Sequence, residues 1–87
     1  MKTNHRRQYL LGAMAAQEFL RHTQTFLYCS RQFQPRTLRW EIEQITVVHS
    51  PEYRAGFLDA IGTYVLTALE GCLLNPHNWS VLGDLER

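Results

Sequence analysis

The sequence predicts an all-α protein: a small helical bundle of two long helices, about residues 5–29 and 51–74, joined by a short middle helix, about residues 37–48. Apolar residues recur at helical spacing in both long segments, and neither segment has an internal proline. The third observation is size. With 87 residues the chain forms one domain, residues 1–87, which buries only about 60–65% of its unfolded surface. Partner subunits often supply the missing core in such small proteins, so we expect a homodimer.

The first long helix is expected to begin after Asn4, a residue type that caps helix N-termini. Polar residues gather on one side of this segment and apolar residues on the other, as in an amphipathic helix. The apolar side holds Tyr9, Ala13, Ala16, Leu20 and Leu27, with Phe19 and Phe26 beside it.

The middle segment, residues 37–48, has two interpretations. Leu38, Trp40 and Ile42 alternate as residues of a strand do, whereas Leu38, Ile42 and Ile45 form a helical stripe that Thr37 can cap. We favour the helix, because a strand here has no evident partner in the chain except residues 79–82, or its own copy in a dimer.

The second long helix has clear start and stop signals. Ser50 is expected to cap it, Pro51 suits the first helical position, and the acidic Glu52 suits the positive end of the helix dipole. Asn75 and Pro76 are expected to end it.

This second helix is apolar around most of its circumference, and such a helix is usually buried on several sides. We therefore expect part of it to form a dimer interface, with Phe57, Ile61, Tyr64, Val65 and Leu69. Small residues lie four apart at Gly12 and Ala16, and again at Gly56 and Ala60, and let helices approach closely. These pairs serve either packing within one subunit or contact between subunits.

Charge is unevenly distributed along the chain. Residues 1–39 hold seven basic residues against Glu18, a net charge of +6, whereas residues 40–87 carry a net charge of −5. Eight of the nine basic residues are arginine, which makes planar, bidentate contacts with carboxylates or phosphates. The two halves either neutralise each other or meet a charged partner.

The residues do not indicate an enzyme, a metal site or a cofactor. Cys29 and Cys72 are far apart and are expected to be small buried hydrophobes, and the four histidines lack ligand spacing. No glycine-rich loop precedes a helix. Glu41 and Glu43 would share a face only on a strand, so we expect no paired-carboxylate catalysis.

The N-terminal stretch HRRQYLLGAMAAQ has features of a twin-arginine export signal, with Arg6 and Arg7 ahead of apolar residues. The apolar part, Tyr9 to Gly12, is shorter than the roughly 7–15 residues of a signal. The longest apolar run of the chain is also far below the roughly 20 residues of a membrane span. We expect a cytoplasmic protein without membrane contact.

The stretch SRQFQPRTLRW, residues 30–40, carries the candidate binding residues Arg31, Phe33, Arg36, Arg39 and Trp40. Tryptophan and arginine are enriched in interface hot spots, so we expect these residues to contact a protein partner. The other interpretation for Trp40 is a core position, and for Trp79 a position folded back on the helix ends.

We therefore expect a non-catalytic protein that binds a partner protein stoichiometrically, as an inhibitor, adaptor or regulator, in the manner of small proteins encoded by phages and mobile elements. The alternative is a dimeric nucleic-acid-binding regulator that uses the arginine-rich first half. Against it, the nearly neutral net charge of +1 is unusual for a dedicated nucleic-acid-binding domain.

Overall fold

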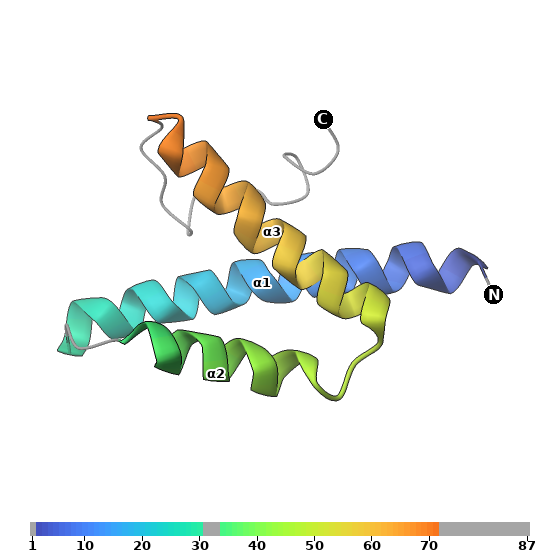
Figure 1. Ribbon diagram of the computed structural model, residues 1–87, viewed down its shortest axis with the longest axis horizontal. Helices are drawn as coiled ribbons and strands as arrows, with labels where there is room; N and C mark the ends of the chain where they lie inside the picture. Colours follow the sequence, from blue (N-terminus) through green and yellow to red (C-terminus); the bar gives the residue numbers. More distant parts are fainter. Residues whose placement is uncertain (1, 31–33, 72–87) are drawn as a thin grey trace.

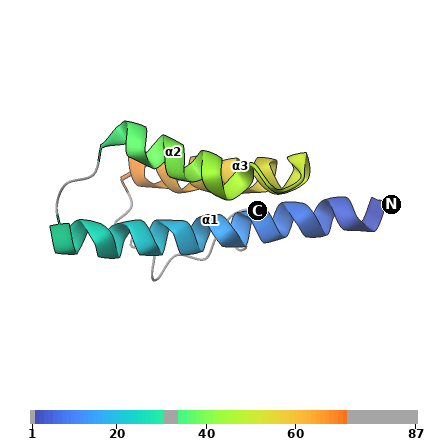
Figure 2. The ribbon, with the colours of Figure 1, turned by 90° about the horizontal axis from the view of Figure 1, so that it is seen from below.

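The fold is all-α, as the sequence predicts (Figure 1). The computed structural model describes residues 2–30 and 34–71, which form the helices α1 (Lys2–Ser30), α2 (Pro35–Thr46) and α3 (Pro51–Leu69). α2 runs back in the direction opposite to α1, and α3 then crosses over α1. Seen from below, α1 forms one layer, while α2 and α3 lie in a second layer (Figure 2).

The predicted first helix is present as α1, which spans 29 residues. It begins at Lys2, so Asn4 lies inside the helix and the predicted start after Asn4 is wrong. Its predicted apolar face is covered only in the middle. Ala13, Ala16 and Phe19 are buried, whereas Phe26 and Leu27 are 44% and 41% exposed. The reason is the crossing geometry, because α3 meets α1 near its middle and leaves the last turns of α1 outside that contact.

The middle segment is a helix, and the strand alternative is wrong. α2 begins two residues earlier than expected because Gln34 is extended (φ −96°, ψ 149°) and Pro35 occupies the first turn, where a missing N–H costs nothing. Thr37 therefore lies inside the helix and does not cap it. Three apolar side chains of α2 pack against the core: Leu38, Ile42 and Ile45.

α3 begins as predicted and ends earlier. The Ser50 hydroxyl oxygen accepts a hydrogen bond from the Tyr53 N–H at 3.2 Å, and Glu52 lies in the first turn. The helix ends at Leu69, five residues before the predicted end at residue 74, because Gly71 adopts a positive φ of 93°. A glycine in this left-handed conformation is a common helix stop.

Replacing the cap tests how much this helix start contributes. Ser50→Ala is expected to lower the free energy of unfolding by about 1 kcal/mol, because the Tyr53 N–H loses its acceptor. Urea unfolding followed by circular dichroism measures the change. Ser50→Asp is the control, since it keeps an acceptor and adds a favourable charge at the helix N-terminus. Equal stability of the alanine variant and the parent protein would contradict this role.

α1 and α3 cross through two glycines that lie against each other's helix backbone. A Cβ atom added to Gly12 would lie 1.9 Å from the carbonyl oxygen of Tyr53, and one added to Gly56 would lie 1.9 Å from the carbonyl oxygen of Tyr9. Both distances are far inside van der Waals contact, so the crossing requires glycine on both helices. The structure thus places the pairs Gly12–Ala16 and Gly56–Ala60 inside one subunit.

The core is small and centres on one aromatic pair. The rings of Phe19 and Phe57 lie 5.7 Å apart at 49°, a tilted arrangement that aromatic pairs favour. Phe57 is fully buried. The remaining buried hydrophobic residues in the described part of the chain are all alanines: Ala13, Ala16 and Ala60.

Polar contacts at the edge of the crossing also join α1 to α3. The Tyr9 hydroxyl donates a 2.6 Å hydrogen bond to the Asp59 carboxylate. This bond, with burial and the nearby negative charge, raises the pKa of Tyr9 from 10.0 to about 12. The neutral phenol is therefore favoured in the fold, so this stabilisation is present below pH 10 and is lost as the pH rises through about 12. His5 and Glu52 form an exposed pair at 3.8 Å, and such surface pairs contribute little.

None of the described helices combines the length and the apolar character that a bilayer crossing requires.

Cys29 is exposed near the end of α1, so the prediction that it is buried is wrong. The reason is again that the last turns of α1 lie beyond the crossing. Cys72, Asn75, Pro76 and Trp79 lie outside the described residues.

Candidate partner-binding site

The outer face of α2 carries the described part of the predicted binding site. The core contacts of Leu38, Ile42 and Ile45 fix the rotation of this helix. Arg36, Arg39 and Trp40 then lie on the exposed side, because they are offset from the packed stripe around the helix. The indole of Trp40 is 58% exposed, so the core interpretation for this residue is wrong.

These side chains line an open hollow of about 350 Å³, formed by Arg36, Thr37, Arg39 and Trp40. The Arg36 Nε–H donates a 2.9 Å hydrogen bond to the side-chain oxygen of Gln34, which holds the guanidinium near the helix start. Among the described residues, no acid forms a salt bridge with Arg36 or Arg39. The hollow therefore presents two cationic donors beside an exposed aromatic ring.

This exposed face continues toward the end of α2, beyond the residues predicted from the sequence to bind a partner. Glu43 and Val47 are exposed, and they line a second hollow of about 250 Å³ with Thr46 and Arg54. Glu43 follows Arg36 and Arg39 at spacings of seven and four residues, which a helix places on one side. In a helix, this spacing predicts that Glu43 shares the exposed face with the two arginines.

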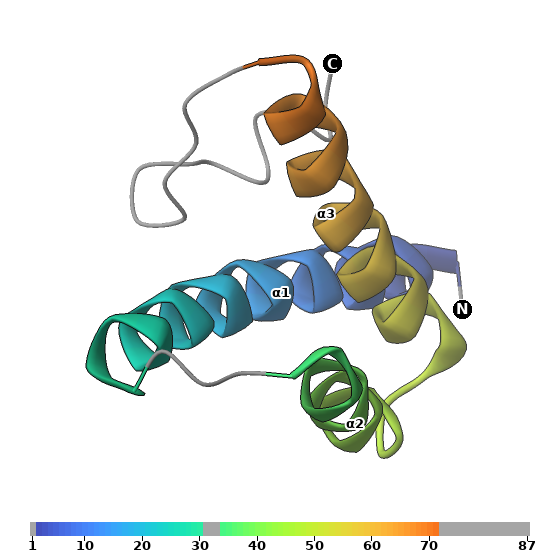
Figure 3. The ribbon, with the colours of Figure 1, turned by 60° about the vertical axis from the view of Figure 1, so that its left-hand side comes forward.

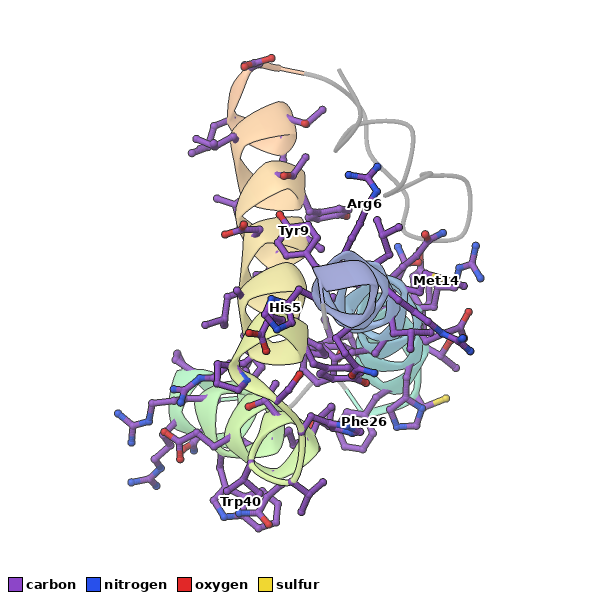
Figure 4. All side chains as sticks on the ribbon, turned by 90° about the vertical axis from the view of Figure 1, so that its right-hand side faces the viewer. His5, Arg6, Tyr9, Met14, Phe26 and Trp40 are labelled. Carbon is purple, nitrogen blue, oxygen red and sulfur yellow. The ribbon has the colours of Figure 1, made fainter. Side chains whose placement is uncertain are left out.

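Arg31 and Phe33, the other two predicted binding residues, lie outside the described residues. The basic residues of the first half do not all share one surface. Figure 4 shows Arg6 on the side of α1 that faces away from α2, whereas Trp40 lies on the far side of α2. Arg6 and the arginines of α2 therefore cannot line a single groove.

The predicted dimer-interface residues separate into three groups. Phe57 offers no exposed surface to a second copy, because its ring is fully buried against Phe19 inside one chain. Ile61 and Tyr64 are half-buried and pack against the core. Val65 and Leu69 are 47% and 77% exposed and are available to a second molecule.

The described residues hold no cluster of three metal-ligating side chains. Glu41 and Glu43 lie on a helix, two residues apart, so they point in different directions. Within the described residues, the groups with raised pKa values are Tyr9, through its bond to Asp59, and Tyr53 and Tyr64, through burial. All three tyrosines belong to α1 or α3 and not to the outer face of α2. They act as neutral, structural groups at physiological pH.

No family model, curated protein or solved structure matches this chain.

Proposed function

We propose that this protein binds a partner protein stoichiometrically and without catalysis, as an inhibitor, adaptor or regulator, and that the outer face of α2 holds an acidic segment of that partner. The observation that supports this proposal is the exposed Trp40 beside two arginines that no described acid neutralises. An exposed tryptophan flanked by arginines is the composition of an interface hot spot.

The chemistry of the face favours carboxylates with apolar neighbours. Arg36 and Arg39 lie three residues apart on the helix and can each form a bidentate bond to a carboxylate. The indole of Trp40 offers apolar area to an aliphatic or aromatic side chain that follows the acid. Glu43 on the same face repels a continuous phosphate backbone, whereas a peptide can place an amide or a basic residue there.

The double variant Arg36→Ala with Arg39→Ala tests this function. The probes are short fluorescent peptides with Asp or Glu beside leucine or phenylalanine, compared with analogues in which Asn and Gln replace the acids. We expect the parent protein to bind the acidic peptides, and the double variant to lose at least about tenfold in affinity, since hydrogen bonds to charged groups contribute about 1.5–3 kcal/mol. Fluorescence anisotropy measures the affinity, and circular dichroism checks that the fold persists.

Arg6→Ala with Arg7→Ala is the matched control, because it removes the same charge from α1. This control is expected to bind the acidic peptides normally. Equal losses in the two double variants, or no preference for acidic peptides, would overturn the proposal. A labelled single-stranded oligonucleotide tests the nucleic-acid alternative. If that alternative holds, the affinity for the oligonucleotide should fall steeply with salt and should depend on both arginine pairs.

A further inference from the structure

A second exposed surface lies on α3, on the side opposite its contact with α1. Its members repeat at alternating spacings of three and four residues, the spacing of a two-helix seam. We call this surface the α3 seam: Ala55, Leu58, Gly62, Val65 and Leu69. Leu58, Val65 and Leu69 are 43%, 47% and 77% exposed, and the seam contains no charged residue.

The described residues leave the seam uncovered because the crossing uses the other side of α3. Gly56, Phe57 and Ala60 face α1 and are buried. Figure 3 shows the second half of α3 extending past α1, on the side away from α2.

Gly62 gives the seam a second unusual property. Gly12 and Gly56 are explained by the helix crossing, where a Cβ atom would meet backbone. A Cβ atom at Gly62 would meet nothing within 4 Å, so packing against the described residues does not require glycine there. Glycine in a helix interior lowers helix stability, and its use in a seam lets another helix backbone approach closely.

Charges beside the seam indicate which helix fits it. Arg54 lies along one edge of the seam, and Asp59 lies along the other, five residues later. In a parallel pair of identical helices, residues at this spacing face each other across the two copies. Arg54 forms no salt bridge with a described residue, and Asp59 uses one carboxylate oxygen for Tyr9, which leaves the other oxygen for a guanidinium. An antiparallel pair would instead place the two edges that carry Asp59 side by side, away from Arg54 of the other copy.

We propose that the α3 seam binds the same seam of a second copy of this chain, with the two α3 helices parallel and Arg54 of each copy beside Asp59 of the other. The dimer places Leu58, Val65 and Leu69 against their counterparts, and the two Gly62 residues allow close approach between them. The dimer uses the α3 seam, whereas Arg36, Arg39 and Trp40 of the proposed partner-binding site line a hollow on α2. Arg54 borders both surfaces, because it also lines the second hollow beside Glu43.

Sedimentation equilibrium of the full chain tests the dimer. We expect a concentration-dependent monomer–dimer equilibrium for the parent protein. Leu69→Lys should raise the dissociation constant by roughly a hundredfold, because each dimer loses two buried leucines and gains two facing charges. The fold should persist, because Leu69 is 77% exposed in one chain. Met14→Lys, at a 48% exposed position of α1, is the matched control and should leave dimerisation unchanged.

Arg54→Glu, compared with Arg54→Gln, tests the orientation. The parallel arrangement places two acids together in the glutamate variant, so its dimer should be weaker than that of the glutamine variant, and the difference should shrink at high salt. Equal dissociation constants would overturn the parallel arrangement. A parent protein that stays monomeric at every concentration would overturn the dimer. A Leu69→Lys variant that unfolds would also overturn it, because it would show that the rest of the chain covers the seam.

Discussion

Gly12→Ala is expected to lower the free energy of unfolding by about 3 kcal/mol or more, a large effect for a single added methyl group. The added Cβ atom would lie 1.9 Å from the Tyr53 carbonyl oxygen and 3.1 Å from the Phe57 nitrogen. Both neighbours belong to the backbone of α3, so relief requires the helices to move apart and to loosen the whole core. Overpacking typically costs about 1–3 kcal/mol even where flexible side chains can yield.

A loss of this size is serious, because natural domains retain only about 0.05–0.15 kcal/mol of stability per residue. Urea unfolding of Gly12→Ala and Gly62→Ala side by side, in dilute solution, isolates the steric cause. Both variants gain the same helix propensity, about 1 kcal/mol, but only Gly12 lies against backbone. Gly62→Ala should therefore be at least as stable as the parent chain. Similar stability of the two variants would show that the crossing tolerates a wider separation.

Local signals in the sequence predicted the three helices because those signals act within a few residues. Ser50 accepts the predicted hydrogen bond at the start of α3, and the Leu38–Ile42–Ile45 stripe packs as a helix should. The predicted end of the last helix, at Asn75–Pro76, is wrong. Gly71 comes before these residues in the chain, and its positive φ already ends α3.

The sequence does not predict equally well which side of each helix faces the core and which side is exposed. α3 is apolar nearly all round, so hydrophobicity does not distinguish the side that contacts α1 from the exposed side. Gly56 does distinguish them, because a glycine that touches backbone marks the contact side and places its neighbour Phe57 in the core. Without that step, the apolar pattern alone places Phe57 in a dimer interface.

The candidate site on α2 was predicted in part for a related reason. Residue type alone suggested Arg36, Arg39 and Trp40, and the structure brings all three to one hollow. The exposure of Trp40 depends on the rotation of α2, which the packing of Leu38 and Ile42 sets. That packing is a long-range property, so the sequence left the core and surface interpretations of Trp40 open.

Phe57→Ala is expected to lower the free energy of unfolding by about 3–5 kcal/mol, the usual cost of truncating a buried phenylalanine. Among the residues that the structure describes, Phe57 is the largest fully buried side chain, and its ring supports Phe19 across the crossing. Apart from these two rings, the described buried hydrophobic residues are short alanines, which cannot move in to fill the space. Little of the cavity should therefore collapse, and the loss should lie toward the upper end of this range.

Leu66→Ala on the same helix provides the comparison, since Leu66 is 63% exposed and should change stability by no more than about 0.5 kcal/mol. Thermal and urea unfolding of both variants, followed at several wavelengths, measures the difference. If Phe57 belonged mainly to an interface between copies, its truncation would weaken dimerisation and leave the unfolding of the dilute chain nearly unchanged. The buried Phe19–Phe57 contact predicts the reverse, a less stable single chain, because α1 and α3 meet through that pair whether or not a second copy is bound.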